Sequence, residues 1–210
     1  MRIVITRASM VLAISVLWLV LAAFSSPEPS LTVPARANIF GAGQAEPPDP
    51  GGGGAGVLPP TVPLPPGAKR VVTFPSVTGR VNPIMDYEDW NGPAGDGVGG
   101  TNVESFGGIS GIVHAANGMF LVGVFLGDGI SPTPEPSRLD FTNGMPAEPL
   151  TPELGQTFLI GDGKGHKYNV PLEATRLYLG FADGYLYQGP PGWYDNNAGE
   201  LKVTVDITVG

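Results

Sequence analysis

The sequence predicts an all-β protein, in the form of a jelly-roll-like β-sandwich with no substantial helix in the mature chain. Apolar and polar residues alternate throughout residues 201–209, a period of two that is typical of a half-buried strand. Other short apolar runs are separated by clusters of Gly, Pro, Asn and Asp, which favour turns. No window carries the apolar spacing of an amphipathic helix three turns long. Short strands without helices are typical of sandwiches and barrels.

Residues 1–37 are predicted to be a signal peptide. Two arginines precede residues 8–24, which are mostly apolar, and this order matches the charged and apolar regions of a secretory signal. The apolar run is shorter than the roughly 20 residues of a spanning helix. Cleavage sites of the small-x-small type occur at residues 35–37 and near Ala23. We therefore expect a secreted, periplasmic or cell-surface protein with no membrane span in the mature chain.

The charge and the cysteine content narrow the possible functions. The net charge is −8, and phosphate binding requires clustered Lys and Arg, so nucleic acid is an unsuitable partner. The chain has no cysteine, so its stability outside the cell must come from the core or from a metal ion.

Residues 38–68 are rich in Gly and Pro and are predicted to be an irregular N-terminal segment. Residues 38–43 are apolar enough to pair as an edge strand. Residues 46–67 are expected to form no regular ladder and to be the most mobile part of the mature protein. The β-sandwich domain is assigned to residues 69–210.

Seven runs within this domain have the composition of strands. Residues 119–126 are apolar at every position, which suits a central strand covered on both faces. The two C-terminal runs are expected to face a common core through Leu177, Leu179, Phe181, Leu201, Val203, Val205 and Ile207. The predicted strands are residues 70–74, 119–126, 138–141, 156–160, 167–170, 176–181 and 201–209.

Oxygen-bearing side chains gather at the two ends of the last hairpin connection. Asp183 lies at one end, and Asp195, Asn196 and Asn197 lie at the other, so closing the hairpin brings them together. Ca²⁺ takes roughly 6 to 8 oxygen ligands in flexible geometry, and carboxylate, amide and main-chain oxygens all serve. Asp and Asn are also common turn formers, so a plain turn remains the alternative.

The order of motifs resembles the PA-I type galactophilic lectins from about residue 55 to the end of the chain. The resemblance rests on Pro66-Gly67, on Trp90-Asn-Gly-Pro-Ala-Gly-Asp96, on residues 106–126, and on residues 177–205 with Asp183 and Tyr194-Asp-Asn-Asn-Ala-Gly199. In that family a jelly-roll sandwich binds one Ca²⁺, which directly ligates sugar hydroxyls. The resemblance implies side-chain ligands from Asp183, Asn196 and Asn197 and main-chain ligands from Trp193 and a residue near Val81.

The sequence departs from the family at two places, and both affect the sugar specificity rather than the metal site. The loop at residues 184–192 is longer than in the family and includes Tyr185, Tyr187 and Gln188, which can reshape or cover the site. The family's sugar-contacting histidine is absent from residues 97–100. The calcium site is therefore what the resemblance implies best, and galactose specificity is not carried over.

The sequence favours a calcium-dependent carbohydrate-binding module with no enzymatic activity. Its partner would be a carbohydrate or glycoconjugate, and a homo-oligomer is compatible with the sequence. Sugar rings pack on aromatic side chains while their hydroxyls take polar contacts. The expected ligand-binding residues are Asp183, Tyr185, Tyr187, Trp193, Asp195, Asn196 and Asn197.

Two alternatives remain open. In the first, Ca²⁺ only stabilises a structural or envelope protein that binds no sugar. In the second, a hydrolase uses the acidic cluster of Asp86, Glu88 and Asp89 beside Trp90, since glycosidases use paired carboxylates. Ser110 lacks the context of a nucleophile elbow, and the two histidines are too few for a zinc site.

Overall fold

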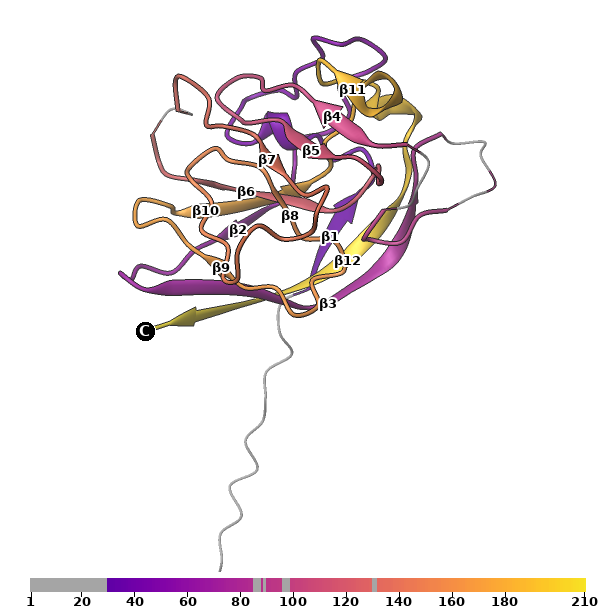
Figure 1. Ribbon diagram of the computed structural model, residues 1–210. Coiled ribbons are helices and arrows are strands. Elements are labelled where there is room, and N and C mark those ends of the chain that lie inside the picture. The colour runs from indigo at the N-terminus through magenta and orange to yellow at the C-terminus, as the bar shows by residue number, and fades with distance from the viewer. Residues whose placement is uncertain (1–29, 85–87, 89, 96–98, 130–131) are drawn as a thin grey trace, which may run out of the picture.

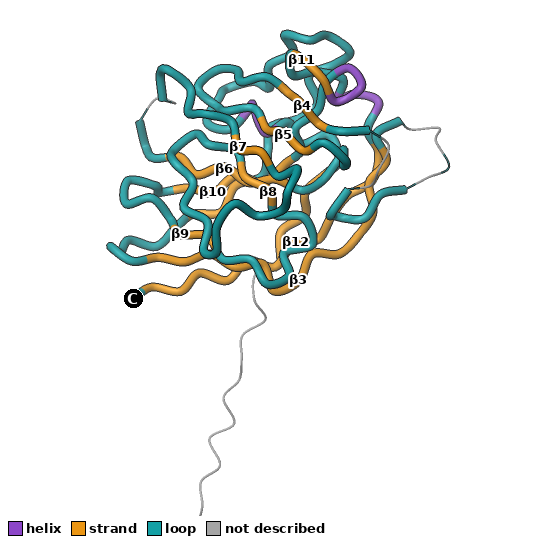
Figure 2. The backbone as a smooth tube through the Cα atoms, in the orientation of Figure 1, coloured by secondary structure: helices purple, strands orange, loops and turns teal. Residues whose placement is uncertain are grey.

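The computed structural model describes residues 30–84, 88, 90–95, 99–129 and 132–210. These residues form three four-stranded sheets (Figure 1). Loops rather than helices join the strands, as Figure 2 shows, and the helical elements are three single 3₁₀ turns. The prediction of an all-β fold is confirmed, while the jelly-roll order stays a prediction.

The first sheet has the order β1-β12-β3-β9, and a long antiparallel ladder dominates it. Its strands are β1 (Ser30–Pro34), β12 (Ala198–Val209), β3 (Arg70–Asn82) and β9 (Tyr168–Asn169). Alternation in β12 buries Leu201 and Val203 against the core and leaves Lys202 in solvent. The register shifts between Thr204 and Asp206, as a β-bulge does.

The second sheet forms the interior layer, with the order β2-β10-β6-β8. Its strands are β2 (Thr61–Pro63), β10 (Arg176–Gly180), β6 (Val122–Leu126) and β8 (Phe158–Leu159). Every residue of β6 is buried, which confirms a central strand covered on both faces.

The third sheet is small and mixed, with the order β11-β4-β5-β7. It combines β11 (Gln188–Gly189), β4 (Thr101–Val103), β5 (Ile112–His114) and β7 (Leu139–Asp140). The pairing of β11 with β4 ties the loop after β10 to this sheet (Figure 1).

Aromatic side chains join the first sheet to the second. The ring of Phe158 on β8 lies 5.0 Å from that of Phe125 and 4.8 Å from that of Tyr168 on β9. Tyr168 in turn meets Phe74 of β3 edge to face at 5.5 Å. Such pairs stabilise a core beyond the area that they bury.

The expected strands and core agree with the structure. Each of the seven predicted runs contains a strand, although several are only two residues long. All the side chains expected in the common core are buried except Ile207, which is partly buried and packs against it.

The N-terminal part of the domain differs from the sequence predictions. Residues 30–37, assigned above to a signal peptide, lie inside the fold: β1 pairs with β12, and Val33 is fully buried. Cleavage after Ala37 would remove this strand, whereas cleavage near Ala23 would keep it. The rest of the predicted signal lies outside the described residues.

Two expectations for residues 38–68 are wrong. The start of this segment is no edge strand but a buried 3₁₀ turn, η1 (Ile39–Gly41), capped by the side chain of Asn38. Within the segment expected to lack a ladder, β2 pairs with β10. Asn38 also donates from Nδ2 to the carbonyl oxygens of Pro48 and Ala55, at 2.8 and 3.0 Å.

In the part of the chain that the structure describes, no helix has the length and apolar character needed to cross a membrane.

Removing residues 30–37 is expected to destabilise the protein strongly. A chain that starts at Ser30 keeps β1, whereas one that starts at Asn38 opens the edge of β12 and loses the burial of Val33. We expect the free energy of unfolding to fall by roughly 3 kcal/mol or more between the two chains. Urea denaturation of the matched pair measures the difference, and equal midpoints would contradict the placement of β1.

Candidate functional site

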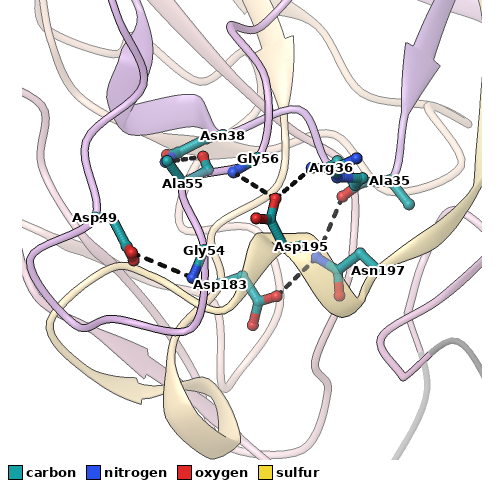
Figure 3. A network of polar contacts seen from close by, with 10 residues as sticks. All are labelled: Ala35, Arg36, Asn38, Asp49, Gly54, Ala55, Gly56, Asp183, Asp195 and Asn197. Carbon is teal, nitrogen blue, oxygen red and sulfur yellow. Dashed lines mark hydrogen bonds and ion pairs between the residues drawn. The ribbon is translucent and has the colours of Figure 1, made fainter.

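A buried carboxylate lies where β10 leaves the core. Asp183 follows three residues after β10 and is only 3% exposed. Its Oδ1 accepts the main-chain N–H of Gly184, and its Oδ2 accepts a hydrogen bond from Nδ2 of Asn197, both at 2.8 Å. The same amide nitrogen also donates to the carbonyl oxygen of Ala35, at 3.3 Å (Figure 3). Asn197 therefore connects β1 and the start of β12 to the end of β10.

Tyr194 fixes the loop that carries Asn197. This side chain is fully buried within η3 (Tyr194–Asn196). Its hydroxyl accepts the N–H of Asp183 at 3.1 Å and donates to the carbonyl oxygen of Phe181 at 2.9 Å. Burial, together with the nearby Asp183, holds the pKa of Tyr194 well above its usual value. Nothing in the sequence indicated this role of Tyr194, because its burial follows only from the tertiary fold.

The environment of Asp183 favours its neutral form. Burial raises the pKa of this carboxyl to about 7, and the hydrogen bonds from Asn197 and Gly184 only partly oppose the shift. A cation beside the carboxylate would reverse this preference, since an opposite charge favours the ionised form.

Three buried amide oxygens near Asp183 have no hydrogen-bond donor among the described residues. They are Oδ1 of Asn91, of Asn196 and of Asn197. The side-chain nitrogen of Asn91 is unpaired as well. Buried polar atoms are nearly always paired in native proteins, so this group of free acceptors indicates a missing partner.

Asn91 is a site residue that the sequence analysis missed. Its main chain forms a β-bridge with Val81, with N–H to oxygen distances of 2.8 and 3.0 Å. This long-range pairing brings Asn91 to the cavity that Asp183 lines. One feature of the sequence could have indicated Asn91: it lies in the Trp90 to Asp96 motif on which the resemblance to the lectins rests, although no role was assigned to it there.

Asp183, Asn91 and Asn196 line one cavity of about 240 Å³. The remaining lining is mostly apolar and comes largely from the loop after Asp183, including η2 (Tyr185–Tyr187). The ring of Tyr185 lies 5.0 Å from that of Trp193. The cavity therefore combines one polar region with aromatic and aliphatic walls. Its lining residues are Pro83, Ile84, Asn91, Asp183, Gly184, Tyr185, Leu186, Tyr187, Trp193 and Asn196.

The donor set suits a hard cation that is held by few charges. One carboxylate and three amide oxygens are the ligand types that Ca²⁺ accepts, and waters or ligand hydroxyls can complete its shell. The described residues contain no group of three or more His, Cys, Asp or Glu that could hold a metal. Any cation here would depend on neutral oxygens, which implies modest affinity.

The structure separates some of the predicted ligands from others. Asp195 does not line the cavity: its carboxylate pairs with Arg36 and accepts the N–H of Gly56 at 3.2 Å (Figure 3). Its expected role in ligand binding is therefore not supported by its position. Val81 also lies outside the lining, and its carbonyl oxygen accepts the N–H of Asn91. The remaining predicted residues line the cavity or contact Asp183.

The glycine-rich segment at residues 49–56 holds the loop that carries Trp193. Gly52 accepts the N–H of Trp193 at 2.8 Å, and Gly54 accepts that of Tyr194 at 3.0 Å. A Cβ atom on Gly53 would lie 2.5 Å from the Trp193 ring. The absence of side chains thus allows close packing, and the prediction of an irregular connection missed this role.

The other candidate chemistries receive little support from the described residues. Ser110 is fully buried, donates to the carbonyl oxygen of Gly111 and accepts the N–H of Thr157, so it acts in the core. Asp86 and Asp89 of the acidic cluster lie outside the described residues, and Glu88 is exposed.

Neither the known protein families nor the characterised protein sequences contain a match to this chain. The resemblance to the PA-I type lectins therefore stays a prediction.

In the absence of metal, the stability of the protein should fall as pH rises towards neutrality. Asp183 has a pKa of about 7 when folded and 3.8 in the reference state, so the folded chain holds a proton that the unfolded chain releases between these values. The free energy of unfolding should decrease by at most about 1.4 kcal/mol per pH unit in this window. Urea denaturation in a chelator, from pH 4.5 to 8, measures the slope.

The matched control is Asp183→Asn, which cannot titrate and should flatten this pH dependence. If the variant keeps the slope of the parent protein, another group causes it, and the account of Asp183 is incorrect.

Gly53→Ala should destabilise the protein more than Gly52→Ala. Both glycines have positive φ, +80° and +74°, so the backbone strain is matched, but a Cβ on Gly52 meets no atom within 4 Å. We expect an additional loss of about 2 kcal/mol for Gly53→Ala, because its methyl group overlaps the Trp193 ring. Denaturation and the near-ultraviolet circular dichroism of tryptophan report the two effects. Equal losses would show that Gly53 has no special contact with Trp193.

Proposed function

We propose that this protein is a secreted or cell-surface, calcium-dependent carbohydrate-binding module without enzymatic activity. The observation that carries the proposal is the set of unpaired amide oxygens of Asn91, Asn196 and Asn197, the last of which bonds the buried carboxylate of Asp183 through its amide nitrogen. Asn91 and Asn196 line the same cavity as Asp183, and most of the remaining lining is aromatic and aliphatic. Such a combination supports a ligand that is held through a cation and through ring packing.

The cation accounts for the free acceptors and for the buried charge. Ca²⁺ would take oxygen atoms from Asp183 and from the amides, and it would keep Asp183 ionised despite its burial. With one carboxylate among the donors, we expect a dissociation constant of about 10⁻⁴ to 10⁻³ M, as in extracellular modules. Hydroxyl groups of a ligand could complete the shell, as in the lectins that the sequence resembles.

The aromatic wall suits the apolar face of a sugar ring. Trp193 and Tyr185 lie side by side, and both line the cavity. Sugars typically pack their C–H faces on such rings while their hydroxyls bind polar groups. We favour binding over hydrolysis because glycosidases use two carboxylates that flank the bond, and Asp183 supplies the single carboxylate among the lining residues described.

A structural calcium site is the second candidate. The bond between Asp183 and Asn197 already joins the end of β10 to the start of β12. An ion there could stabilise this junction without binding any sugar. A glycan array with and without EDTA separates the two functions, because only the first predicts calcium-dependent capture of a glycan.

Calcium should raise the melting temperature, and Asn91→Leu should abolish this rise without destabilising the metal-free protein. Leu has nearly the shape of Asn, and it removes two buried polar atoms that have no partner. At a hundredfold excess over its dissociation constant, Ca²⁺ should add about 2.7 kcal/mol to the parent protein. Thermal melts and calorimetry measure both effects.

Asn169→Leu is the matched control. The amide of Asn169 is paired, donating to Thr151 at 2.8 Å, and it lies on β9 outside the cavity. This variant should lower the stability of the metal-free protein slightly and leave calcium binding unchanged. If millimolar Ca²⁺ leaves the melting temperature unchanged and gives no heat of binding in the titration, the proposed calcium-dependent function is contradicted.

A further inference from the structure

Leu186 is a large apolar side chain that lines the cavity and is mostly exposed to solvent. It is 71% exposed, and its neighbour Tyr185 is 59% exposed. Both residues line the cavity. Leu186 also adopts a left-handed backbone conformation, with φ of 53° and ψ of 33°. Neither burial nor the local backbone geometry accounts for leucine at this position.

The backbone at Leu186 would suit Asn or Gly better. A left-handed conformation costs free energy for residues with a Cβ atom, and Asn and Gly tolerate it best. Tyr187 also has a positive φ, of 58°, but its side chain is buried and packs closely over Gly118. Packing in the interior therefore explains why residue 187 is a tyrosine, whereas no such packing explains the leucine at residue 186. Strained residues of this kind are concentrated at ligand sites.

The lining of the cavity is of two chemical kinds. Asp183, Asn91 and Asn196 provide polar groups, and the amide oxygens of the two asparagines have no donor among the described residues. Leu186 and Ile84 provide apolar surface, and Ile84 is 50% exposed. A ligand that contacts both kinds of lining must itself have a hydroxyl-rich part and an apolar part, because a hydroxyl group against the apolar lining would lose its hydrogen bonds.

We propose that the site selects glycosides that carry an apolar substituent, and that Leu186 and Tyr185 determine this specificity. The inference rests on the proposed function for the hydroxyl-rich part of the ligand and adds a second recognition element for the rest. The sugar would lie against Trp193 and the polar groups of the lining, and the alkyl or aryl group would cover Leu186. Removing this exposed apolar surface from water provides the preference.

The test compares methyl and octyl β-glycosides of galactose, glucose and mannose in the presence of Ca²⁺. Below the micelle concentration, the octyl glycoside of the sugar that binds should bind at least about tenfold more tightly than its methyl glycoside, which equals about 1.4 kcal/mol. Isothermal titration with the full folded domain gives both constants. Leu186→Asn should reduce the ratio to about threefold or less.

Two features keep the variants interpretable. Asn is tolerated in the left-handed conformation, so Leu186→Asn should not lower the melting temperature. Leu172→Asn is the matched control, because Leu172 is 65% exposed and lies outside the cavity. This control should keep the full preference for the octyl glycoside.

The possible outcomes distinguish this inference from the proposed function. Calcium-dependent binding of methyl and octyl glycosides with equal affinity would overturn the inference alone. If no glycoside binds, both fail. Octanol binding as tightly as the octyl glycoside would overturn the inference, since the sugar would then contribute nothing. A dimer that Leu186→Asn dissociates in sedimentation experiments, with glycoside affinities unchanged, would overturn it in favour of a contact between two copies.

Discussion

The buried carboxylate of Asp183 is the constraint on which the packing of β1, β10 and β12 against one another depends. A carboxyl group removed from water needs donors close by, and here they come from Gly184 and Asn197. Asn197 can reach this carboxylate only if the loop after Trp193 is held beside the end of β10. Tyr194 and the glycine-rich segment hold the loop in that position. One electrostatic requirement thus links β1, β10 and β12 at a single point (Figure 3).

The proposed cation would change the charge of this carboxylate. Without a cation, its burial favours a proton, and the neighbouring amide oxygens of Asn91 and Asn196 remain unpaired. With a cation, the carboxylate and the amides would share one positive charge. Because only one full negative charge would face the proposed ion, its binding energy would be small enough for a ligand's hydroxyl groups to add a substantial part of it.

The sequence predicted those features that depend on local pattern, and it missed those that depend on distant partners. Alternation located β12, and the Asp and Asn residues located the loop beside Asp183. Asn91 was missed because only its bridge to Val81 brings it to the cavity, and Asp195 was misplaced because Arg36 draws its carboxylate away. The close packing of residues 49–56 against the loop of Trp193 was missed because glycine permits close approach of main chains as well as an irregular connection.

The pairing of β1 with β12 has a consequence for the order in which the protein can form. The two strands lie far apart in the sequence, since Ser30–Pro34 pairs with Glu200–Thr204. The ribosome must therefore have synthesised β12 before this ladder and the contact between Ala35 and Asn197 can exist. Such long-range pairings make folding slow, so the nascent chain must stay soluble while Asp183 and Asn197 are still apart.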